Sequence, residues 1–366
     1  MNICFDARTA QDHFTGIGRY AVNLARALGP CLLPSEKLVV LRDSGSPSRL
    51  DLSPVAGDRV RIMDFPVSPF SLRQQWTLPR LLRGLGPSVY HSPYYLMPFL
   101  PGVPTVVTIH DLVPLRYPQY FTPLGRLLFS ATIRLAVRAA RAIIADSEAT
   151  ALDIKQFLAV EPMFVIPLAA AFSPQSVENV AAARARCRLP ERYVLYVGSN
   201  KPHKNLVRLV AAWARLQPQA LQLVIAGPWD RRYREARLHA EKLGLGDAVR
   251  FLGAVEEADL PALYSGATLF VFPSEYEGFG LPVLEAMACG VPVACAAVGN
   301  LPELAGQAAL LFDPWSVDAI AQAIRELLND PDRRAELTRL GLERAAQFTW
   351  EETARRTVSV YRQVAV

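Results

Sequence analysis

The chain has 366 residues, of which 51% are apolar (AVILMFWYC) and 20% are charged, and its formal net charge is +5. This length suits two domains with ample apolar material to bury. No apolar run approaches the about 18 residues that a spanning helix needs, no signal-peptide pattern precedes the first strand, and the five cysteines form no CxxC pair. We therefore expect a cytoplasmic protein without a structural zinc.

The excess positive charge lies in the first half of the chain. Residues up to Phe172 include 17 Lys/Arg and 12 Asp/Glu, whereas the remainder includes 22 of each. Attraction to an anionic partner or membrane surface should therefore act in the first half. Nucleic acid is not expected as a partner, because we find no basic cluster interleaved with aromatic residues and no known reader motif.

Short apolar runs alternate with amphipathic stretches along the chain. Most runs are solidly apolar, as in parallel strands buried on both faces, and this predicts a doubly wound α/β arrangement. The pattern pauses near residues 169–190 and then restarts, so two Rossmann-like domains are expected. The expected strands are 2–6, 37–41, 59–65, 88–91, 104–110, 141–147, 163–168, 193–199, 221–227, 249–255, 268–274 and 292–298, and the expected helices include 17–28, 124–140, 205–216, 318–328 and 348–366.

Ligands of open α/β sheets bind at the carboxyl ends of strands, so the loops there are candidate sites. The first loop follows strand 2–6, holds Gly16 and Gly18, and precedes a helix expected to begin near residues 17–19. Glycines at a helix start let backbone N–H groups approach a phosphate. The same glycines also fit a turn that allows tight packing.

Two further loops carry residues that could contact a ligand. His110 and Asp111 end strand 104–110 beside prolines, which favours a position facing a cleft over a satisfied core histidine; His91 is a similar residue with a weaker claim. After strand 193–199, Ser199 and Lys204 precede a helix, and a lysine there can reach phosphate oxygens. A solvated surface position is the alternative for a lysine.

The last two candidate loops could contact a ligand through backbone groups in one case and through carboxylates in the other. Ala254 and Val255 follow Gly253, and their backbone could meet a base edge, while the acids 256 and 259 fit helix caps. The stretch 275–290, EYEGFGLPVLEAMACG, places Glu277 in a glycine-rich loop and Glu285 at the end of the first helical turn. One acid can hold a sugar ring and the other a ribose, while the uncovered backbone receives a diphosphate. A helix-dipole role explains Glu285 alone and gives no reason for Glu277.

These residues resemble the retaining glycosyltransferases of family 4, the group 1 glycosyltransferases, and in particular bacterial polysaccharide mannosyltransferases. The match covers nearly the whole chain and includes the family's E-x7-E motif, here Glu277 and Glu285, within EGFGLPVLEAMACGVPV. The resemblance implies a GT-B fold of two Rossmann-like domains facing a central cleft. It also implies an acceptor-binding domain over residues 1–170, a donor-binding domain over 171–347, and a final helix over 348–366 that packs back on the first domain.

The resemblance also implies residue roles. Glu277 bonds the donor sugar near its 3- and 4-hydroxyls, Glu285 holds the ribose, and Lys204 neutralises the diphosphate with help from the N–H of Gly16. His110 lies near the sugar's 6-position and the reacting centre. Backbone N–H groups for sugar and phosphate come from Phe279, Gly280 and Leu281, and the base meets the backbone at Ala254 and Val255. Many members have arginine where this chain has His203, so the resemblance does not imply a strong phosphate contact at that position.

The expected reaction is transfer of a hexose, with mannose first, from a GDP- or UDP-sugar to a glycan, lipid-linked oligosaccharide or small-molecule acceptor. The sequence has no DxD motif at the end of an expected strand, since its one Asp-x-Asp, Asp330-Pro331-Asp332, follows the expected helix 318–328; no divalent metal or other cofactor is therefore expected. The alternatives are a nucleotide-sugar epimerase of the same fold and a non-catalytic nucleotide-sugar-binding protein. The E-x7-E context disfavours an epimerase. A non-catalytic binding protein would be expected to have lost catalytic residues, whereas Glu277, His110 and Lys204 are all present.

A basic helix in the first half is a candidate membrane contact. Arg134, Arg138 and Arg141 follow an i, i+4, i+7 spacing on an expected helix that also carries Leu127, Leu128, Phe129 and Ile133. Such a face fits an anionic membrane that holds a lipid-linked acceptor, which would place the protein peripherally on the inner face of the membrane. A solvated helix face on a cytosolic protein fits the same spacing.

Overall fold

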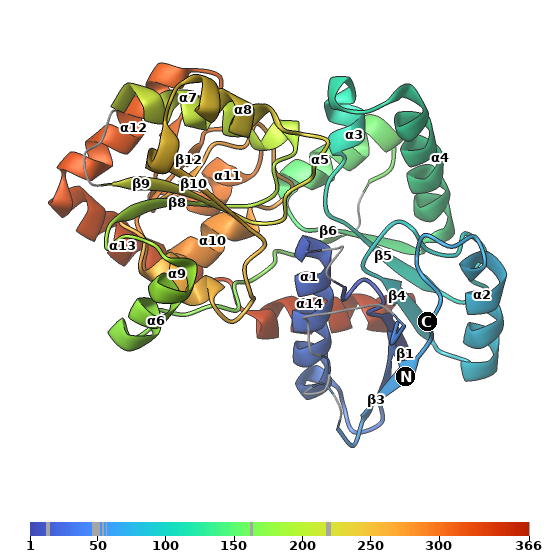
Figure 1. The fold of residues 1–366 in the computed structure, drawn as a ribbon. Helices are drawn as coiled ribbons and strands as arrows, with labels where there is room; N and C mark the ends of the chain where they lie inside the picture. Colours follow the sequence, from blue (N-terminus) through green and yellow to red (C-terminus); the bar gives the residue numbers. More distant parts are fainter. Residues whose placement is uncertain are drawn as a thin grey trace. The chain divides into compact units, whose positions relative to one another are not determined.

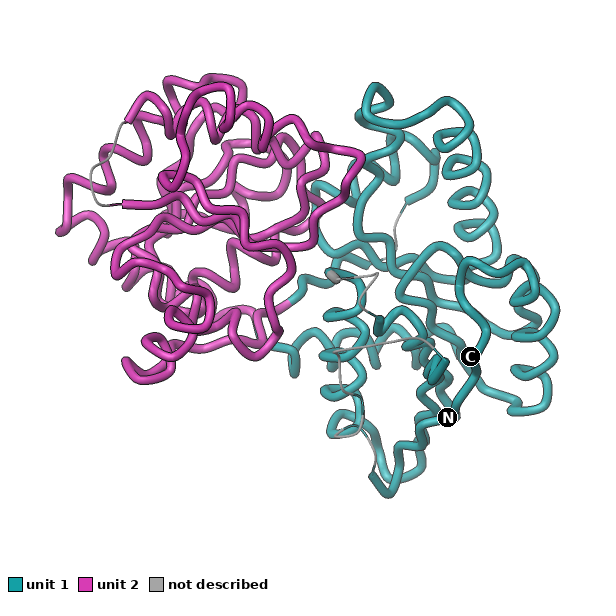
Figure 2. Tube along the Cα trace, viewed as in Figure 1, with its two compact units in different colours: residues 1–168, 349–366 teal, residues 169–348 magenta. Residues whose placement is uncertain are grey.

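The computed structural model describes residues 1–11, 15–45, 52, 55, 57–161, 164–216 and 221–365. The chain forms two compact units, which are coloured separately in Figure 2. Unit 1 comprises Met1–Leu168 and Thr349–Val366, and unit 2 comprises Ala169–Phe348. Among the described helices, none combines the length and the apolar character needed to cross a membrane.

Unit 1 contains a parallel sheet in the order β3-β2-β1-β4-β5-β6-β7 (Figure 1). Its strands are β1 (Asn2–Asp6), β2 (Lys37–Arg42), β3 (Val60–Asp64), β4 (Val89–Ser92), β5 (Thr105–Ile109), β6 (Ala142–Ala145) and β7 (Phe164–Val165). Its helices are α1 (Thr15–Leu28), η2 (Gly29–Cys31), α2 (Gln74–Leu85), α3 (Val113–Arg116), η4 (Pro118–Tyr120), α4 (Pro123–Ala139), α5 (Glu148–Leu158) and the C-terminal α14 (Trp350–Val364), which packs on α1.

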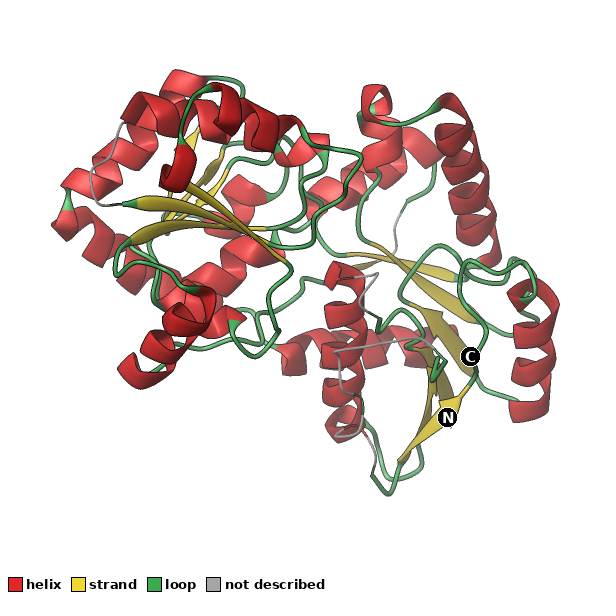
Figure 3. Cartoon of the chain, in the orientation of Figure 1, coloured by secondary structure: helices red, strands yellow, loops and turns green. Residues whose placement is uncertain are grey.

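Unit 2 contains a second parallel sheet in the order β10-β9-β8-β11-β12-β13, flanked by helices (Figure 3). Its strands are β8 (Tyr193–Val197), β9 (Gln222–Ala226), β10 (Val249–Gly253), β11 (Leu269–Phe272), β12 (Val293–Ala296) and β13 (Ala309–Phe312). Its helices are α6 (Val177–Cys187), η5 (Pro202–Lys204), α7 (Leu206–Leu216), α8 (Glu235–Lys242), η6 (Gly246–Ala248), α9 (Leu260–Ser265), α10 (Leu281–Ala288), α11 (Leu301–Ala305), α12 (Val317–Asn329) and α13 (Pro331–Ala345).

The predicted doubly wound α/β arrangement is confirmed in both units. Every residue of the central strands β4, β5, β8 and β11 is buried, as expected for solidly apolar runs covered by helices on both faces. The strand order reverses between β1 and β4 in unit 1 and between β8 and β11 in unit 2. Each reversal is a topological switch point, where the loops beyond the strands diverge and leave a crevice for a ligand.

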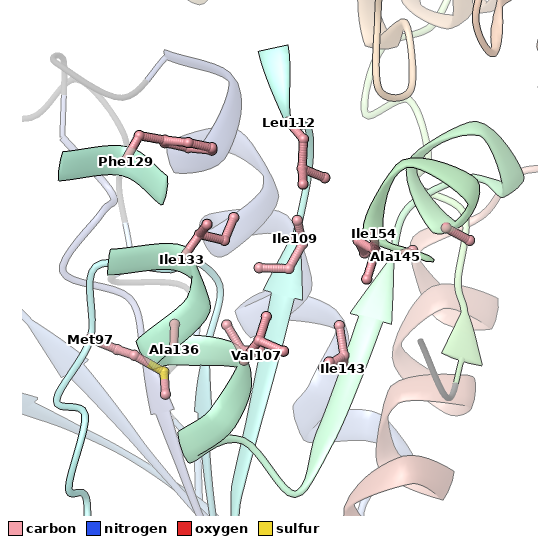
Figure 4. Close-up of a cluster of buried hydrophobic side chains, with 12 residues drawn as sticks. Met97, Val107, Ile109, Leu112, Phe129, Ile133, Ala136, Ile143, Ala145 and Ile154 are labelled. Carbon is pink, nitrogen blue, oxygen red and sulfur yellow. The ribbon is translucent and has the colours of Figure 1, made fainter. Parts of the chain in front are cut away.

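The core of unit 1 beneath α4 corrects one sequence-based expectation. Phe129 and Ile133 of α4 are buried and belong to one core cluster with Val107 and Ile109 of β5 (Figure 4). These two residues therefore belong to the core and not to the exposed face on which they were expected. Arg141 also departs from the expectation, because α4 ends at Ala139 and this arginine lies beyond it.

The start of α1 differs from the expected loop. Gly16 and Gly18 were expected to precede or begin the helix, but α1 begins at Thr15, so both glycines lie in its first turn. Residues 12–14 of the expected loop lie outside the described residues. The N–H groups of a first turn have no partner within the helix, so the phosphate-binding hypothesis for Gly16 keeps its chemical basis.

A buried ion pair anchors the chain just beyond β1. Arg8 donates to both carboxylate oxygens of Asp6 at 2.8 and 2.6 Å, to Gln74 at 3.1 Å and to the carbonyl of Val67 at 2.6 Å. Tyr90 donates a further bond of 2.6 Å to Asp6. Burial would raise the pKa of Asp6, but the charge and hydrogen bonds of Arg8 outweigh it and hold that pKa below its ordinary value. The pair thereby ties β1, β4 and α2 together at the switch point of unit 1.

We expect Arg8→Met to lower the free energy of unfolding by about 3–5 kcal/mol, because the variant leaves the Asp6 carboxylate buried without its partner. Because the pKa of Asp6 is lowered on folding, the pair's contribution is present above the unfolded pKa of about 3.9 and is lost as the pH falls. Urea unfolding at pH 7 and pH 3 measures both effects.

The exposed pair Lys155–Glu161 provides the control, since its side chains are 61% and 74% exposed. Lys155→Ala should cost at most about 1 kcal/mol. An equally small loss in Arg8→Met would contradict the anchoring role of the buried pair.

Candidate active site

The candidate site of unit 2 lies at its switch point, where the loops after β8 and β11 meet. Lys204 ends η5 beyond β8, and Glu277 lies in the loop beyond β11. The Lys204 ammonium donates to Glu277 Oε1 at 2.6 Å, and the two side chains are 17% and 12% exposed. Two residues separated by 73 positions thus form one largely covered ion pair at the edge where ligands of such sheets bind.

Backbone contacts hold these two loops together. The N–H of Glu275 donates to the carbonyl of His203 at 2.8 Å. Asn205, in the left-handed region with φ of 61°, donates from its side chain to the carbonyls of Pro273 and Pro314 at 3.0 and 2.7 Å. The Lys204–Glu277 pair therefore sits on a frame of hydrogen bonds that does not depend on the pair itself.

The pair can accept a ligand without being broken. The contact uses one oxygen of Glu277 and one N–H of Lys204, whereas a carboxylate has about four acceptor positions and an ammonium has three N–H groups. A ligand that carries both hydroxyls and phosphate oxygens complements this combination. The negative charge of Glu277 also reaches Tyr196, whose pKa is raised first by burial and then by that carboxylate.

The loop between Glu277 and α10 requires glycine at one position. Gly280 has a φ of 98°, and a Cβ built there would lie 2.6 Å from Cδ2 of Leu301. Phe279 is buried, and its carbonyl accepts a bond of 2.8 Å from the Asn300 side chain. Leu281 is the first residue of α10; Pro282 has no N–H and the N–H of Val283 donates to the carbonyl of Gly280 at 2.9 Å, so Leu281 carries the N–H of this turn that has no acceptor within the helix.

Glu285 lies deeper than expected. It was expected at the end of the first turn of its helix, but it is the fifth residue of α10 and only 2% exposed. Its Oε2 accepts a hydrogen bond of 2.9 Å from the Tyr264 hydroxyl of α9. Tyr264 therefore holds this carboxylate in place, and the ribose contact stays a prediction.

The remaining donor-site candidates of unit 2 lie at strand ends. Ser199 is half-buried after β8, and its carbonyl accepts a bond of 2.9 Å from Tyr196. Ala254 is exposed and Val255 half-buried just beyond β10, where Gly253 has a φ of 73°. Their backbone is thus accessible beyond the edge strand of the sheet, as contact with a base would require.

His110 belongs to unit 1 and is held by three neighbours. Its Nδ1 lies 3.1 Å from Asp146 Oδ2, its Nε2 lies 3.1 Å from the carbonyl oxygen of Pro93, and the ring meets Tyr20 edge-on at 4.8 Å. The imidazole side chain is 14% exposed. His110 therefore has a defined orientation at the carboxyl end of β5.

His91 is a buried core histidine whose hydrogen bonds are satisfied, and it does not face a ligand site. It is fully buried, and its ring nitrogens bond the Tyr361 hydroxyl at 2.6 Å and the Thr108 hydroxyl at 2.8 Å. Burial is the main cause that lowers its pKa to about 3, so the ring is neutral at physiological pH. His91 links α14 to the sheet and has no access to a ligand.

Comparison with known proteins identifies the family. Residues 183–344 match the family described as Glycosyl transferases group 1, and residues 14–170 match Glycosyltransferase Family 4. The O-antigen chain mannosyltransferase B of Escherichia coli is 30% identical, and the alignment covers 99% of this chain and 100% of that protein. The chain belongs to the group 1 glycosyltransferases of family 4.

Solved structures show the same fold as this glycosyltransferase. Sucrose-phosphate synthase from Thermosynechococcus elongatus has a TM-score of 0.78 and 27% identity, over 99% of this chain and 98% of that chain. The Anabaena protein HepE, solved in complex with UDP and glucose, has a TM-score of 0.78 and 20% identity over 99% of both chains. The predicted GT-B fold, with two parallel-sheet α/β domains, is confirmed.

Neither the contact of Asp146 with His110 in unit 1 nor the burial of His203 in unit 2 of this glycosyltransferase was predicted from the sequence. Asp146, which holds His110, follows β6 directly, so the strand-end rule that selected His110 would have selected it too. The burial of His203 had no such signal. Its side chain is enclosed, and burial, followed by the charges of Lys204 and Lys201, lowers its pKa well below the ordinary value. His203 is therefore neutral and adds no cation beside Lys204.

We expect Gly280→Ala to destabilise the glycosyltransferase by about 2–5 kcal/mol, since a left-handed conformation costs an alanine roughly 1–2 kcal/mol and steric overlap typically adds about 1–3 kcal/mol. Gly84→Ala in α2 is the control, because a Cβ there meets nothing within 4 Å. That variant should be stabilised by about 0.5–1 kcal/mol. Urea unfolding measures both, and equal stability of the two variants would contradict the strain assigned to Gly280.

Proposed function

We propose that this glycosyltransferase moves a hexose, with mannose as the first candidate, from a nucleoside-diphosphate sugar to a glycan, a lipid-linked oligosaccharide or a small-molecule acceptor. GDP is the first candidate nucleotide and UDP the second, and the anomeric configuration is retained. The observation that carries the proposal is the Lys204–Glu277 pair at the switch point of unit 2. A cation and a carboxylate at one strand edge complement a ligand with a diphosphate at one end and sugar hydroxyls at the other.

The reaction breaks the bond between the anomeric carbon and a diphosphate oxygen and forms a bond from that carbon to an acceptor hydroxyl oxygen. Positive charge grows on the sugar ring, and negative charge grows on the leaving diphosphate. Lys204 and the N–H groups of Gly280 and Leu281 at the start of α10 stabilise the leaving group, while Glu277 orients the sugar through its hydroxyls. The acceptor proton passes to the leaving phosphate oxygen, so no protein nucleophile is required.

Relatives support mannose as the sugar. The Escherichia coli relative matched over its full length is a mannosyltransferase by name, and another relative is named MMP alpha-(1->4)-mannosyltransferase, from Mycolicibacterium hassiacum. The HepE structures with UDP keep a UDP-sugar as the second candidate. We further propose that no divalent metal is needed, because the fixed charge of Lys204 lies where the diphosphate would bind.

The epimerase and binding-only alternatives are not favoured by these relatives, which are transferases by name. They also predict different products. An epimerase would return a changed nucleotide sugar without releasing nucleoside diphosphate, and a binding protein would only raise its melting temperature with ligand. Release of nucleoside diphosphate that increases with an added glycan would therefore separate transfer from both.

Incubation of the protein with GDP-mannose, UDP-glucose and ADP-glucose, with and without mannose-containing glycans, tests the function directly. GDP release from GDP-mannose is expected to exceed release from the other donors, and EDTA should leave it unchanged. Glu277→Ala and Lys204→Ala should each lower kcat about tenfold or more, because each removes a charge-assisted bond of about 1.5–3 kcal/mol.

Lys201→Ala is the matched control, since this exposed lysine lies in the same loop three residues from Lys204. It should retain full turnover. Near-normal transfer by folded Glu277→Ala would overturn the site assignment, and an EDTA-sensitive activity restored by Mg²⁺ would overturn the metal-free proposal.

We also propose that unit 1 contacts an anionic membrane surface from the cytoplasmic side. An exposed stripe of α4, formed by Leu124, Leu127, Leu128, Arg134, Leu135 and Arg138, lies opposite the buried Phe129 and Ile133. Between Phe65 and Ala145 the chain has eight arginines and a single acidic residue, Asp111. An apolar stripe flanked by arginines without compensating acids suits a surface of anionic headgroups.

The neighbouring helix α2 extends this surface. Leu72 just before this helix and Trp76 in its first turn are more than half exposed, and Arg80 and Arg83 follow as exposed residues of α2. The crossovers β3–α2–β4 and β5–α4–β6 both advance along the sheet in the same direction, so right-handed connections place α2 and α4 on one face. A lipid-linked acceptor would then be held close to unit 1.

Co-sedimentation with vesicles tests this contact. The protein should pellet with vesicles that contain anionic phospholipid and remain in solution with neutral ones. A variant with Leu127→Ser, Leu128→Ser, Arg134→Gln and Arg138→Gln should bind at least about tenfold more weakly, since each arginine contributes about 1 kcal/mol near an anionic surface. Leu238→Ser, at an exposed leucine of unit 2, should bind normally. Binding that is independent of lipid charge would remove the proposal.

A further inference from the structure

A carboxylate outside the family motif holds the ring of His110. Asp146 follows β6, is 2% exposed, and places its Oδ2 3.1 Å from His110 Nδ1. On the far side of the ring, Nε2 lies 3.1 Å from the carbonyl oxygen of Pro93, and Tyr20 packs edge-on. The orientation of His110 therefore depends on contacts from three segments, of which Asp146 supplies the charged one.

The register of the sheet explains why these side chains meet. Strands β5 and β6 pair Ile109 with Ala145, so His110 and Asp146 are the next residues on adjacent parallel strands. Ile109 and Ala145 both face the core cluster beneath α4 and α5. Because side chains alternate along a strand, His110 and Asp146 project to the opposite face.

A second bond fixes the backbone at the same place. The hydroxyl of Thr150, in the first turn of α5, donates to the carbonyl of His110 at 3.1 Å. Ser147 caps the same turn by accepting from the N–H of Thr150 at 3.0 Å. The end of β5, the end of β6 and the start of α5 thus form one hydrogen-bonded corner around the histidine.

The carboxylate is not a favourable choice for stability alone. Burial raises the pKa of Asp146, while the hydrogen bond and charge of His110 act in the opposite direction. Its Oδ1 is also enclosed and has no hydrogen-bond partner among the residues that the structure describes. An apolar side chain of similar volume would fill such a position at no greater cost in folding free energy. We therefore look for the contribution of Asp146 in the orientation that it gives to His110.

We propose that Asp146 is a positioning residue for transfer, acting through His110. This inference rests on the proposed function and on the position near the donor sugar that the family resemblance implies for His110. The contact between Oδ2 and Nδ1 fixes the ring plane and with it the position of Nε2 at the carbonyl of Pro93. Without this contact the ring would still pack against Tyr20 but could rotate about its side-chain torsions, which lowers the fraction of productive geometries.

A double-mutant cycle tests the proposal with the full-length protein and the best donor from the panel above. The variants are Asp146→Leu, which removes the acceptor, Asp146→Asn, which keeps an acceptor without charge, His110→Ala, and the combination of His110→Ala with each Asp146 variant. We expect Asp146→Leu to lower kcat about 10- to 100-fold, with the KM for donor changed less than about threefold. Asp146→Asn should recover part of that loss.

The decisive readout is the coupling between the two positions. In the His110→Ala background, neither Asp146 substitution should lower kcat further, because the residue through which Asp146 acts is already absent. Asp153→Asn, at a buried carboxylate of α5 that pairs with Arg116, is the control for a stability effect. It should lower the melting temperature without reproducing the kcat loss.

The outcomes separate the inference from the function on which it rests. Full activity of Asp146→Leu, or equal losses in the presence and absence of the His110 side chain, would overturn the positioning role alone. Wild-type activity of His110→Ala would overturn both the role of His110 and the inference. If Asp146→Leu does not fold, the same comparison with Asp146→Asn decides, since that variant preserves the shape of the side chain.

Discussion

The ion pair between Lys204 and Glu277 is the interaction on which the proposed chemistry depends. The two side chains lie 2.6 Å apart and are largely covered, so either charge alone would carry a desolvation cost that its partner offsets. The pairing keeps a cation and an acceptor of sugar hydroxyls at one strand edge before any ligand arrives. In the proposed reaction, the site is thus preorganised for a donor that carries a phosphate and a sugar, and little reorganisation is needed during transfer.

The fold supplies this arrangement through the reversal of strand order in unit 2. Loops from β8 and β11 diverge at that point, and the bond between the N–H of Glu275 and the carbonyl of His203 holds them at a fixed spacing. Asn205 and Gly280 adopt left-handed conformations that turn the chain toward α7 and α10. Unit 1 also has an ion pair at its own switch point, between Asp6 and Arg8. This pair is structural, because both side chains are buried and their charges are satisfied by neighbouring protein groups.

Much of this architecture could be predicted from local patterns. Solid apolar runs indicated buried parallel strands, and the strand-end rule led to Lys204, Glu277 and His110. The contacts between distant segments could not be predicted in the same way, since the pairing of Lys204 with Glu277 and of His110 with Asp146 depends on strand order and register. The error at Phe129 and Ile133 was avoidable, because their spacing with Ala136 and Val137 follows the helical period of a buried face.

A structure of the protein with a bound nucleotide sugar tests the central claim most directly. We expect the Lys204 ammonium to lie within hydrogen-bonding distance of a diphosphate oxygen, while Glu277 accepts bonds from hexose hydroxyls. This expectation would be contradicted by a donor bound elsewhere in unit 2, with the contact between Lys204 and Glu277 unchanged and neither side chain touching the ligand.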